Sequence, residues 1–117
     1  MTVSEFYAAV GGDHTEVLAR LTSDALITRF LRMLPRDGSM VLLCDSMASG
    51  NAAEAFRAVH SIKGMALNLG LPRLAEVCAV MTEALRGRGD IPESCGELFR
   101  NVQAEYDRVC GAISQLE

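Results

Sequence analysis

The sequence predicts an all-α protein, an antiparallel four-helix bundle preceded by short N-terminal helices. Apolar residues recur at intervals of three and four along most of the chain, and no stretch alternates apolar and polar residues with a period of two. The helix formers Ala, Leu, Glu and Arg are abundant, and only 3 of the 117 residues are proline. Because the predicted helices are joined by short loops, neighbouring helices should pack antiparallel.

Two short helical segments are expected over about residues 2–21. The first begins with the capping box Thr2-x-x-Glu5 and ends before Gly11, since glycine commonly terminates a helix. The second begins at Asp13, a good N-cap residue that precedes an apolar stripe.

The bundle itself is expected over about residues 23–117, so that residues 1–117 form a single domain. Ser23, Asn51, Gly50 and Gly70 stand at predicted helix boundaries, because Ser and Asn cap helix starts and Gly ends helices. The predicted helices cover about residues 23–34, 39–49, 51–69, 71–86 and 92–116.

Composition limits the setting and the partners. The formal net charge is −4, which argues against non-specific binding to nucleic acid. No apolar run is long enough to cross a membrane, and the N-terminus lacks the pattern of a secretory signal. We therefore expect a cytoplasmic monomer.

The four cysteines do not predict a metal site. They are widely spaced, whereas zinc ligands usually come in close pairs. Most of them fall on or beside apolar stripes, where a reduced thiol acts as a small apolar side chain. We expect inert thiols at Cys44, Cys78, Cys95 and Cys110.

The segment around His60 carries the functional signal. Helical geometry places His60 roughly 120° from the middle of the apolar stripe of its helix, so the imidazole should lie at the solvent edge. Gly64 stands inside the same helix, where glycine costs about 1 kcal/mol relative to alanine. Lys63, the only lysine, lies one turn from His60. The stripe itself comprises Ala55, Val59, Ile62, Ala66 and Leu69.

These residues suit the binding of a phosphoryl group. The ammonium of Lys63 offers a charge and hydrogen-bond donors to phosphoryl oxygens. The missing side chain at Gly64 leaves the surface beside the imidazole bare, although a mid-helix glycine can equally serve helix packing.

The pattern H-x-x-K-G-x5-G, from His60 to Gly70, resembles the histidine-containing phosphotransfer (HPt) family. The resemblance covers about residues 51–87 and implies an HPt-like helical bundle. It implies further that His60 is the phosphorylated residue, that Lys63 contacts the phosphoryl oxygens, and that Gly64 lets a receiver domain approach.

The resemblance also implies the chemistry and the partners. His60 would accept a phosphoryl group from a receiver-domain aspartate, or from a kinase, and pass it on in a two-component phosphorelay. The partners would be response-regulator receiver domains or a hybrid histidine kinase. We expect no cofactor in this chain, because Mg²⁺ would come with the receiver domain. The protein would be a phosphoryl carrier and not an autonomous kinase.

An exposed strip beside His60 is the expected docking surface. Leu67 lies about two turns after His60 and Ala53 about two turns before it, on nearly the same line of the helix. Arg57 and Asn68 flank this strip. Because this strip carries little charge, a partner that docks on it could exclude water around the transferring phosphoryl group.

Two other interpretations remain open. The stretch His60-Ser-Ile-Lys63-Gly64 also resembles the phosphorylated domain of chemotaxis kinases, so the chain could be the phosphoacceptor fragment of a larger histidine kinase. Alternatively, the bundle could be an interaction module that carries no phosphate. The sequence contains no P-loop, which argues against kinase activity of the chain itself.

Overall fold

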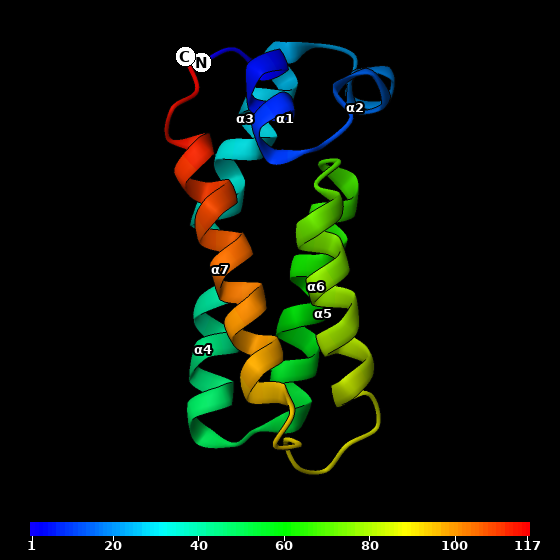
Figure 1. The fold of residues 1–117 in the computed structure, drawn as a ribbon, viewed down its shortest axis with the longest axis vertical. Coiled ribbons are helices and arrows are strands. Elements are labelled where there is room, and N and C mark those ends of the chain that lie inside the picture. Colours follow the sequence, from blue (N-terminus) through cyan, green and yellow to red (C-terminus); the bar gives the residue numbers. More distant parts are fainter.

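The computed structural model describes residues 1–117, and all of its regular secondary structure is helical, as the sequence predicts (Figure 1). A short 3₁₀ turn, Leu34–Arg36, follows the third helix. The α-helices are α1 (Val3–Val10), α2 (His14–Leu21), α3 (Asp24–Met33), α4 (Ser39–Ser49), α5 (Ala52–Asn68), α6 (Pro72–Leu85) and α7 (Cys95–Ile113).

Helices α4 to α7 form an elongated bundle, and α1 to α3 lie across one end of it (Figure 1). In the bundle α5 packs against both α4 and α6, and α6 packs against α7. The molecule measures 42 × 22 × 19 Å. Both chain termini lie at the capped end, where the N-terminal ammonium donates a hydrogen bond to the Gln115 carbonyl at 2.6 Å.

Helix starts follow the capping residues in the sequence. Thr2 and Glu5 form the full capping box of α1. The side chains of Asp13, Ser23 and Asn51 each accept a hydrogen bond from the backbone N–H three residues later. These bonds satisfy amide groups that have no partner inside a helix, so the starts of α2, α3 and α5 were predictable.

Two details differ from the sequence-based expectation. The last helix begins at Cys95, not near Pro92, because the Cys95 amide closes a turn onto the Pro92 carbonyl at 3.0 Å. The segment after Ser23 begins with α3, which packs mainly on α2 and also contacts α1. The bundle helices proper thus start at Ser39.

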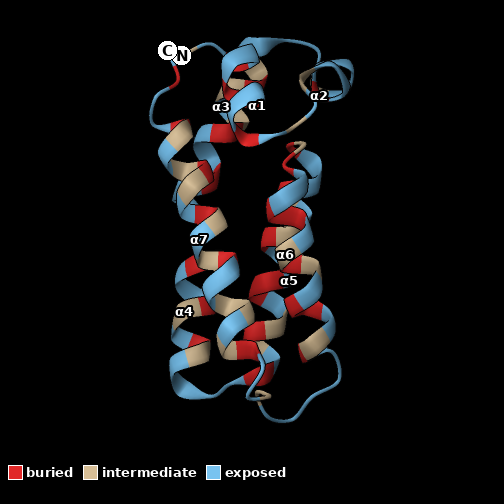
Figure 2. Ribbon diagram, in the orientation of Figure 1, coloured by how far each residue is buried: buried red, intermediate tan, exposed pale blue.

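The core runs along the inner faces of the bundle and continues under the N-terminal helices (Figure 2). The predicted apolar stripe of α5 lies in this core throughout its length. All four cysteines are free thiols. Burial raises the pKa of the Cys78 thiol to about 12, so this thiol stays protonated and unreactive at neutral pH.

Candidate functional site

Helix α5 presents His60 to solvent. Asn51 caps the helix, and the buried face formed by Val59 and Ile62 fixes its rotation against the core. His60 lies on the opposite, exposed face, as the helical spacing predicts. The imidazole is therefore accessible to a second molecule.

An aromatic side chain from the same helix covers one face of the imidazole. The ring of Phe56, one turn before His60, stacks on it with 5.8 Å between centroids and 5° between the planes. The Arg86 guanidinium lies 5.2 Å from the centre of the Phe56 ring, which is a cation–π distance. Glu83 accepts hydrogen bonds from Arg86, the shortest at 2.9 Å. The imidazole, the Phe56 ring and the Arg86 guanidinium thus lie in sequence, each in contact with the next.

The charges near His60 come from α5 and α6. Hydrogen bonding to Arg86 holds the pKa of the Glu83 carboxyl below its usual range, and the positive charge of Lys63 adds a smaller contribution of the same sign. Lys63 is half-buried and takes part in no ion pair. Its ammonium is therefore free to bind an anion that arrives at His60.

Gly64 has open space around it. A Cβ atom placed on this residue would meet no atom of another element within 4 Å, so no neighbouring helix needs the glycine for close packing. Of the two explanations for a mid-helix glycine, the geometry supports an open surface beside His60.

The predicted docking residues all lie on exposed positions of α5. Leu67 is 57% exposed and gives the strip an apolar side chain. Arg57 pairs with Glu54 within the helix. Asn68 accepts a hydrogen bond from Arg20 of α2 at 3.3 Å, so the C-terminal end of the strip is tied to the N-terminal helices.

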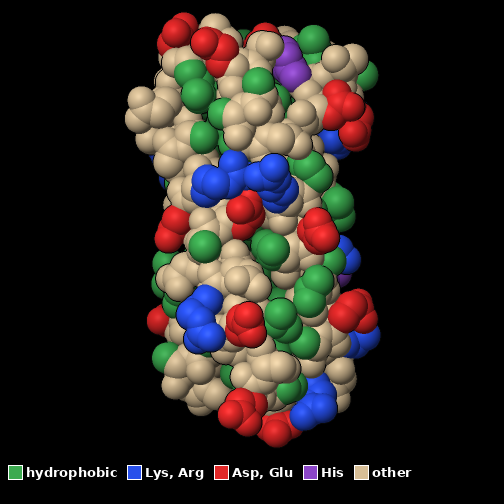
Figure 3. All heavy atoms as spheres, in the orientation of Figure 1, with side chains coloured by type: hydrophobic (Ala, Val, Ile, Leu, Met, Phe, Trp, Pro, Cys, Tyr) green, Lys and Arg blue, Asp and Glu red, His purple; other side chains and the backbone are tan.

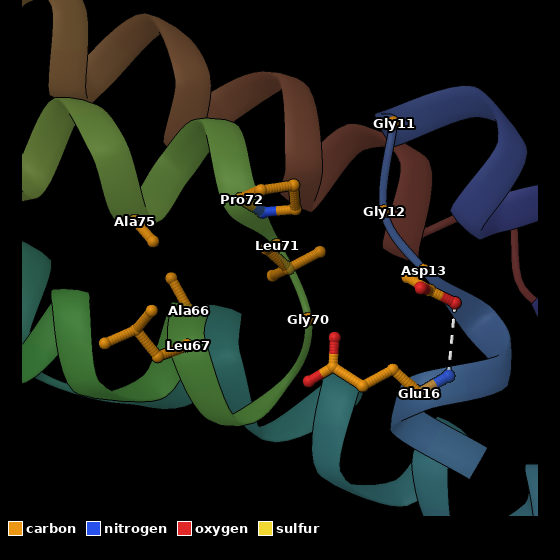
Figure 4. Close-up of a pocket in the computed structure, with 10 residues that line it drawn as sticks. All are labelled: Gly11, Gly12, Asp13, Glu16, Ala66, Leu67, Gly70, Leu71, Pro72 and Ala75. Carbon is orange, nitrogen blue, oxygen red and sulfur yellow. Dashed lines mark hydrogen bonds between the residues drawn. The ribbon is translucent and has the colours of Figure 1, made fainter. Parts of the chain in front are cut away.

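A hollow of about 330 Å³ opens beside the C-terminal end of this strip (Figure 4). It lies between the α1–α2 junction and the turn that joins α5 to α6. Leu67 lines one side, while Asp13 and Glu16 line the other, where the Asp13 carboxylate accepts a hydrogen bond from the Glu16 amide.

The second histidine lies elsewhere and in a different setting. His14 Nε2 is 2.7 Å from a carboxylate oxygen of Asp24, and its ring stacks on Tyr7. Only one of the two histidines therefore has a free ring nitrogen on an open helical face.

No group of three or more His, Cys, Asp or Glu side chains is placed where it could hold a metal ion. None of the helices combines the length and the apolar character needed to cross a bilayer. On the face in Figure 3, acidic and basic side chains are interspersed along the bundle.

Sequence reasoning missed several residues of this site. Phe56 could have been found, because a residue four positions before His60 lies on the same helical face. Glu83, Arg86 and Arg20 could not, because helical periodicity does not reveal which turns of α6 and α2 lie beside α5.

Comparison with known proteins agrees with this geometry. A family model, that of the Hpt domain, matches residues 15–112 of the 117-residue chain. The match extends from α2 into the last turn of α7, so it covers the whole bundle as well as the site. The resemblance drawn from residues 51–87 is thereby confirmed over most of the chain. Searches of curated proteins and of solved structures returned no match.

Proposed function

Because the chain belongs to the Hpt domain family, which carries out histidine phosphotransfer in two-component systems, we propose that His60 is its phosphoacceptor. The observation that carries this assignment is the open surface around His60. The imidazole is exposed on α5, an unpaired ammonium stands one turn away, and Gly64 leaves no side chain in the way. His14, by contrast, is occupied by Asp24.

The proposed step is an in-line transfer from a phosphorylated aspartate of a receiver domain. The neutral imidazole attacks phosphorus with the ring nitrogen that carries the lone pair, which we take to be the outer nitrogen, Nε2. The N–P bond forms as the bond between phosphorus and the aspartate oxygen breaks, and the carboxylate leaves with the electron pair. The phosphorylated ring then releases its remaining N–H proton to water. The reverse sequence passes the group to the next aspartate.

Four side chains support this step in the proposal. Lys63 contacts the phosphoryl oxygens, since its ammonium is unpaired and one turn from His60. Phe56 holds the plane of the imidazole by stacking on it. Glu83 accepts a hydrogen bond from Arg86 and so holds the guanidinium over the Phe56 ring. This cation–π contact stabilises the position of Phe56.

The partners we propose are receiver domains of response regulators or of a hybrid histidine kinase. They would dock on the exposed strip of α5 that includes Ala53, Arg57, Leu67 and Asn68. Mg²⁺ and the acidic residues around it would come with the receiver, and this chain would add no cofactor. We propose that the protein works in the cytoplasm as a monomeric carrier and has no autonomous kinase activity.

A transfer assay tests the proposal. A receiver domain carrying radioactive phosphate is mixed with the protein, and the label on the protein is followed after acid and after alkaline treatment. Phosphohistidine is labile in acid and stable in base, so the expected label is lost only in acid. A base-labile label, or none on the protein with any receiver that the same cells express, would contradict the assignment.

A further inference from the structure

A concentrated positive surface lies on α3, outside the site at His60. Three arginines line a hollow of about 380 Å³ on this helix and the turn that follows it. They stand three and four positions apart, so they share one helical face. These residues are Arg29, Arg32 and Arg36, and together they are called the arginine ridge below.

The ridge is not neutralised within the molecule. None of its guanidinium groups belongs to an ion pair, whereas five other arginines of this chain do. The acidic residues that flank the segment are engaged elsewhere. Asp24 binds His14, and Asp37 accepts the Ser39 amide at 2.9 Å. An acidic protein of formal charge −4 thus exposes three free positive charges on one helical face.

An apolar hollow adjoins the ridge. It has a volume of about 110 Å³, and Met33, which is 56% exposed, lines both hollows. Its other walls come from α3, the turn after it, and the C-terminal end of α5: Phe30, Leu34, Met65, Asn68 and Leu69. The arginine ridge is therefore continuous with an apolar patch that ends on the helix of His60.

The apolar hollow lies within reach of a partner bound at His60. Asn68 comes eight residues after His60, about 12 Å along the helix axis. A typical interface covers roughly 800 Å² of each partner, which corresponds to a radius of about 16 Å. In Figure 1 α3 and α5 both lie on the far side of the molecule, behind α1 and α6.

We propose that the arginine ridge and the apolar hollow form a second contact region for the receiver domain, where acidic side chains of that partner meet Arg29 and Arg36. The inference rests on the proposed function, which makes a receiver domain the partner that docks at His60. Charge complementarity of this kind acts mainly on the rate of association and on the choice among partners. Met33 and the apolar hollow would hold the docked partner after the first encounter.

The double variant Arg29→Gln/Arg36→Gln tests this proposal. Arg32 is left in place because it donates a hydrogen bond to the Leu116 carbonyl at 3.1 Å. Arg100→Gln is the control, since Arg100 is also exposed and unpaired but lies on α7. Association with a receiver that phosphorylates the wild-type protein is measured by stopped flow at several salt concentrations. We expect association of the double variant to slow about tenfold at low salt, with a weaker salt dependence, and no change in the control.

Labelling by phosphoramidate separates this inference from the proposed function. This small donor needs no docking surface, so the double variant should be labelled at the wild-type rate. If the wild-type protein takes no label from either donor, the proposed function fails. If it takes label and the double variant associates as fast as the wild type, only the ridge proposal is overturned. Loss of binding to vesicles of anionic lipid, with association to the receiver unchanged, would also overturn it and assign the ridge to a membrane.

Discussion

At the scale of single residues, the proposed chemistry depends on how the His60 ring is held. His60 is exposed, yet one face of its ring lies against Phe56, with 5.8 Å between the ring centroids. A fixed plane keeps the attacking nitrogen aimed at an incoming phosphorus, and orientation of this kind accelerates a transfer step. Phe56 would thus act as a positioning residue with no contact to the reacting atoms.

Replacement of Phe56 should separate positioning from packing. Phe56→Leu keeps an apolar side chain but loses the flat ring, so labelling by phosphoramidate should slow about tenfold. Phe56→Tyr keeps the ring and should retain the wild-type rate. The labelling rate is compared with the affinity for the receiver, which should change little in either variant. A Leu variant that is labelled as fast as the wild type would mean that the stack has no part in the reaction.

Gly64 gives a second prediction at this scale. A Cβ at this position meets no atom of another element within 4 Å, so Gly64→Gln should fold normally and gain up to about 1 kcal/mol from better helix propensity. The longer side chain would nevertheless stand beside His60 and obstruct a receiver. We expect thermal unfolding at an equal or higher temperature together with slower transfer from the receiver. Unfolding of the variant would show that the glycine serves packing.

At the scale of helices and turns, the two glycines of the H-x-x-K-G-x5-G pattern have opposite roles. Gly70 has a φ of +66° at the turn between α5 and α6, and a Cβ there would lie 2.2 Å from Val17 Cγ2. The turn also lies close to the segment between α1 and α2, since a Cβ added at Gly12 would lie 2.4 Å from the Gly70 carbonyl oxygen. Gly70 therefore allows close packing of this turn against the N-terminal segment, whereas Gly64 has no close neighbour from another element.

This difference predicts opposite effects on stability when each glycine is replaced by alanine. Gly70→Ala should lower the free energy of unfolding by 2 kcal/mol or more, because it combines a strained φ with a steric clash. Gly64→Ala, the control, should raise it by up to about 1 kcal/mol. Denaturant unfolding of both variants measures these changes. Equal effects of the two substitutions would contradict the contrast between the glycines.

The sequence predicts which residues of one helix are buried, but not which residues of other helices lie beside them. Periodicity alone separates Val59 and Ile62, which are buried, from His60, which is exposed, because residues on one helix keep fixed angular relations. The neighbours of His60 from α6 depend on the tilt of two helices and on the turn at Gly70. Arg86 therefore entered the site only with the structure. The start of the last helix was misplaced for a local reason, since a turn at Pro92 could not be distinguished from a first helical turn.

At the scale of the whole molecule, stability should depend on alkaline pH. Burial raises the pKa of the Cys78 thiol from 9.0 to about 12, and it also raises the pKa values of Tyr7 and Tyr106. Between pH 9 and 12 the unfolded chain loses the Cys78 proton while the folded protein keeps it. The stability present below pH 9 is therefore lost as the pH rises through this range.

The size of this effect follows from linkage. One such group should lower the free energy of unfolding by about 1.4 kcal/mol for each pH unit within the range. Denaturant unfolding at pH 8 to 10.5 should show this decrease in the free energy of unfolding. In Cys78→Ala the free energy should fall less steeply with pH, because one titrating group is missing. A wild-type stability that stays constant up to pH 10.5 would mean that the thiol does not titrate with folding.

The proposed function makes His60 the single residue of this protein that carries phosphate. The protein is incubated briefly with a phosphorylated receiver, digested at alkaline pH, and its peptides are sequenced by mass spectrometry. We predict phosphate on the peptide that contains His60, none on the peptide that contains His14, and none on any peptide of His60→Gln. That variant should keep the wild-type melting temperature, because His60 is exposed and its substitution disturbs little of the core. Phosphate on the folded His60→Gln protein, or on a residue other than His60 in the wild type, would contradict the account.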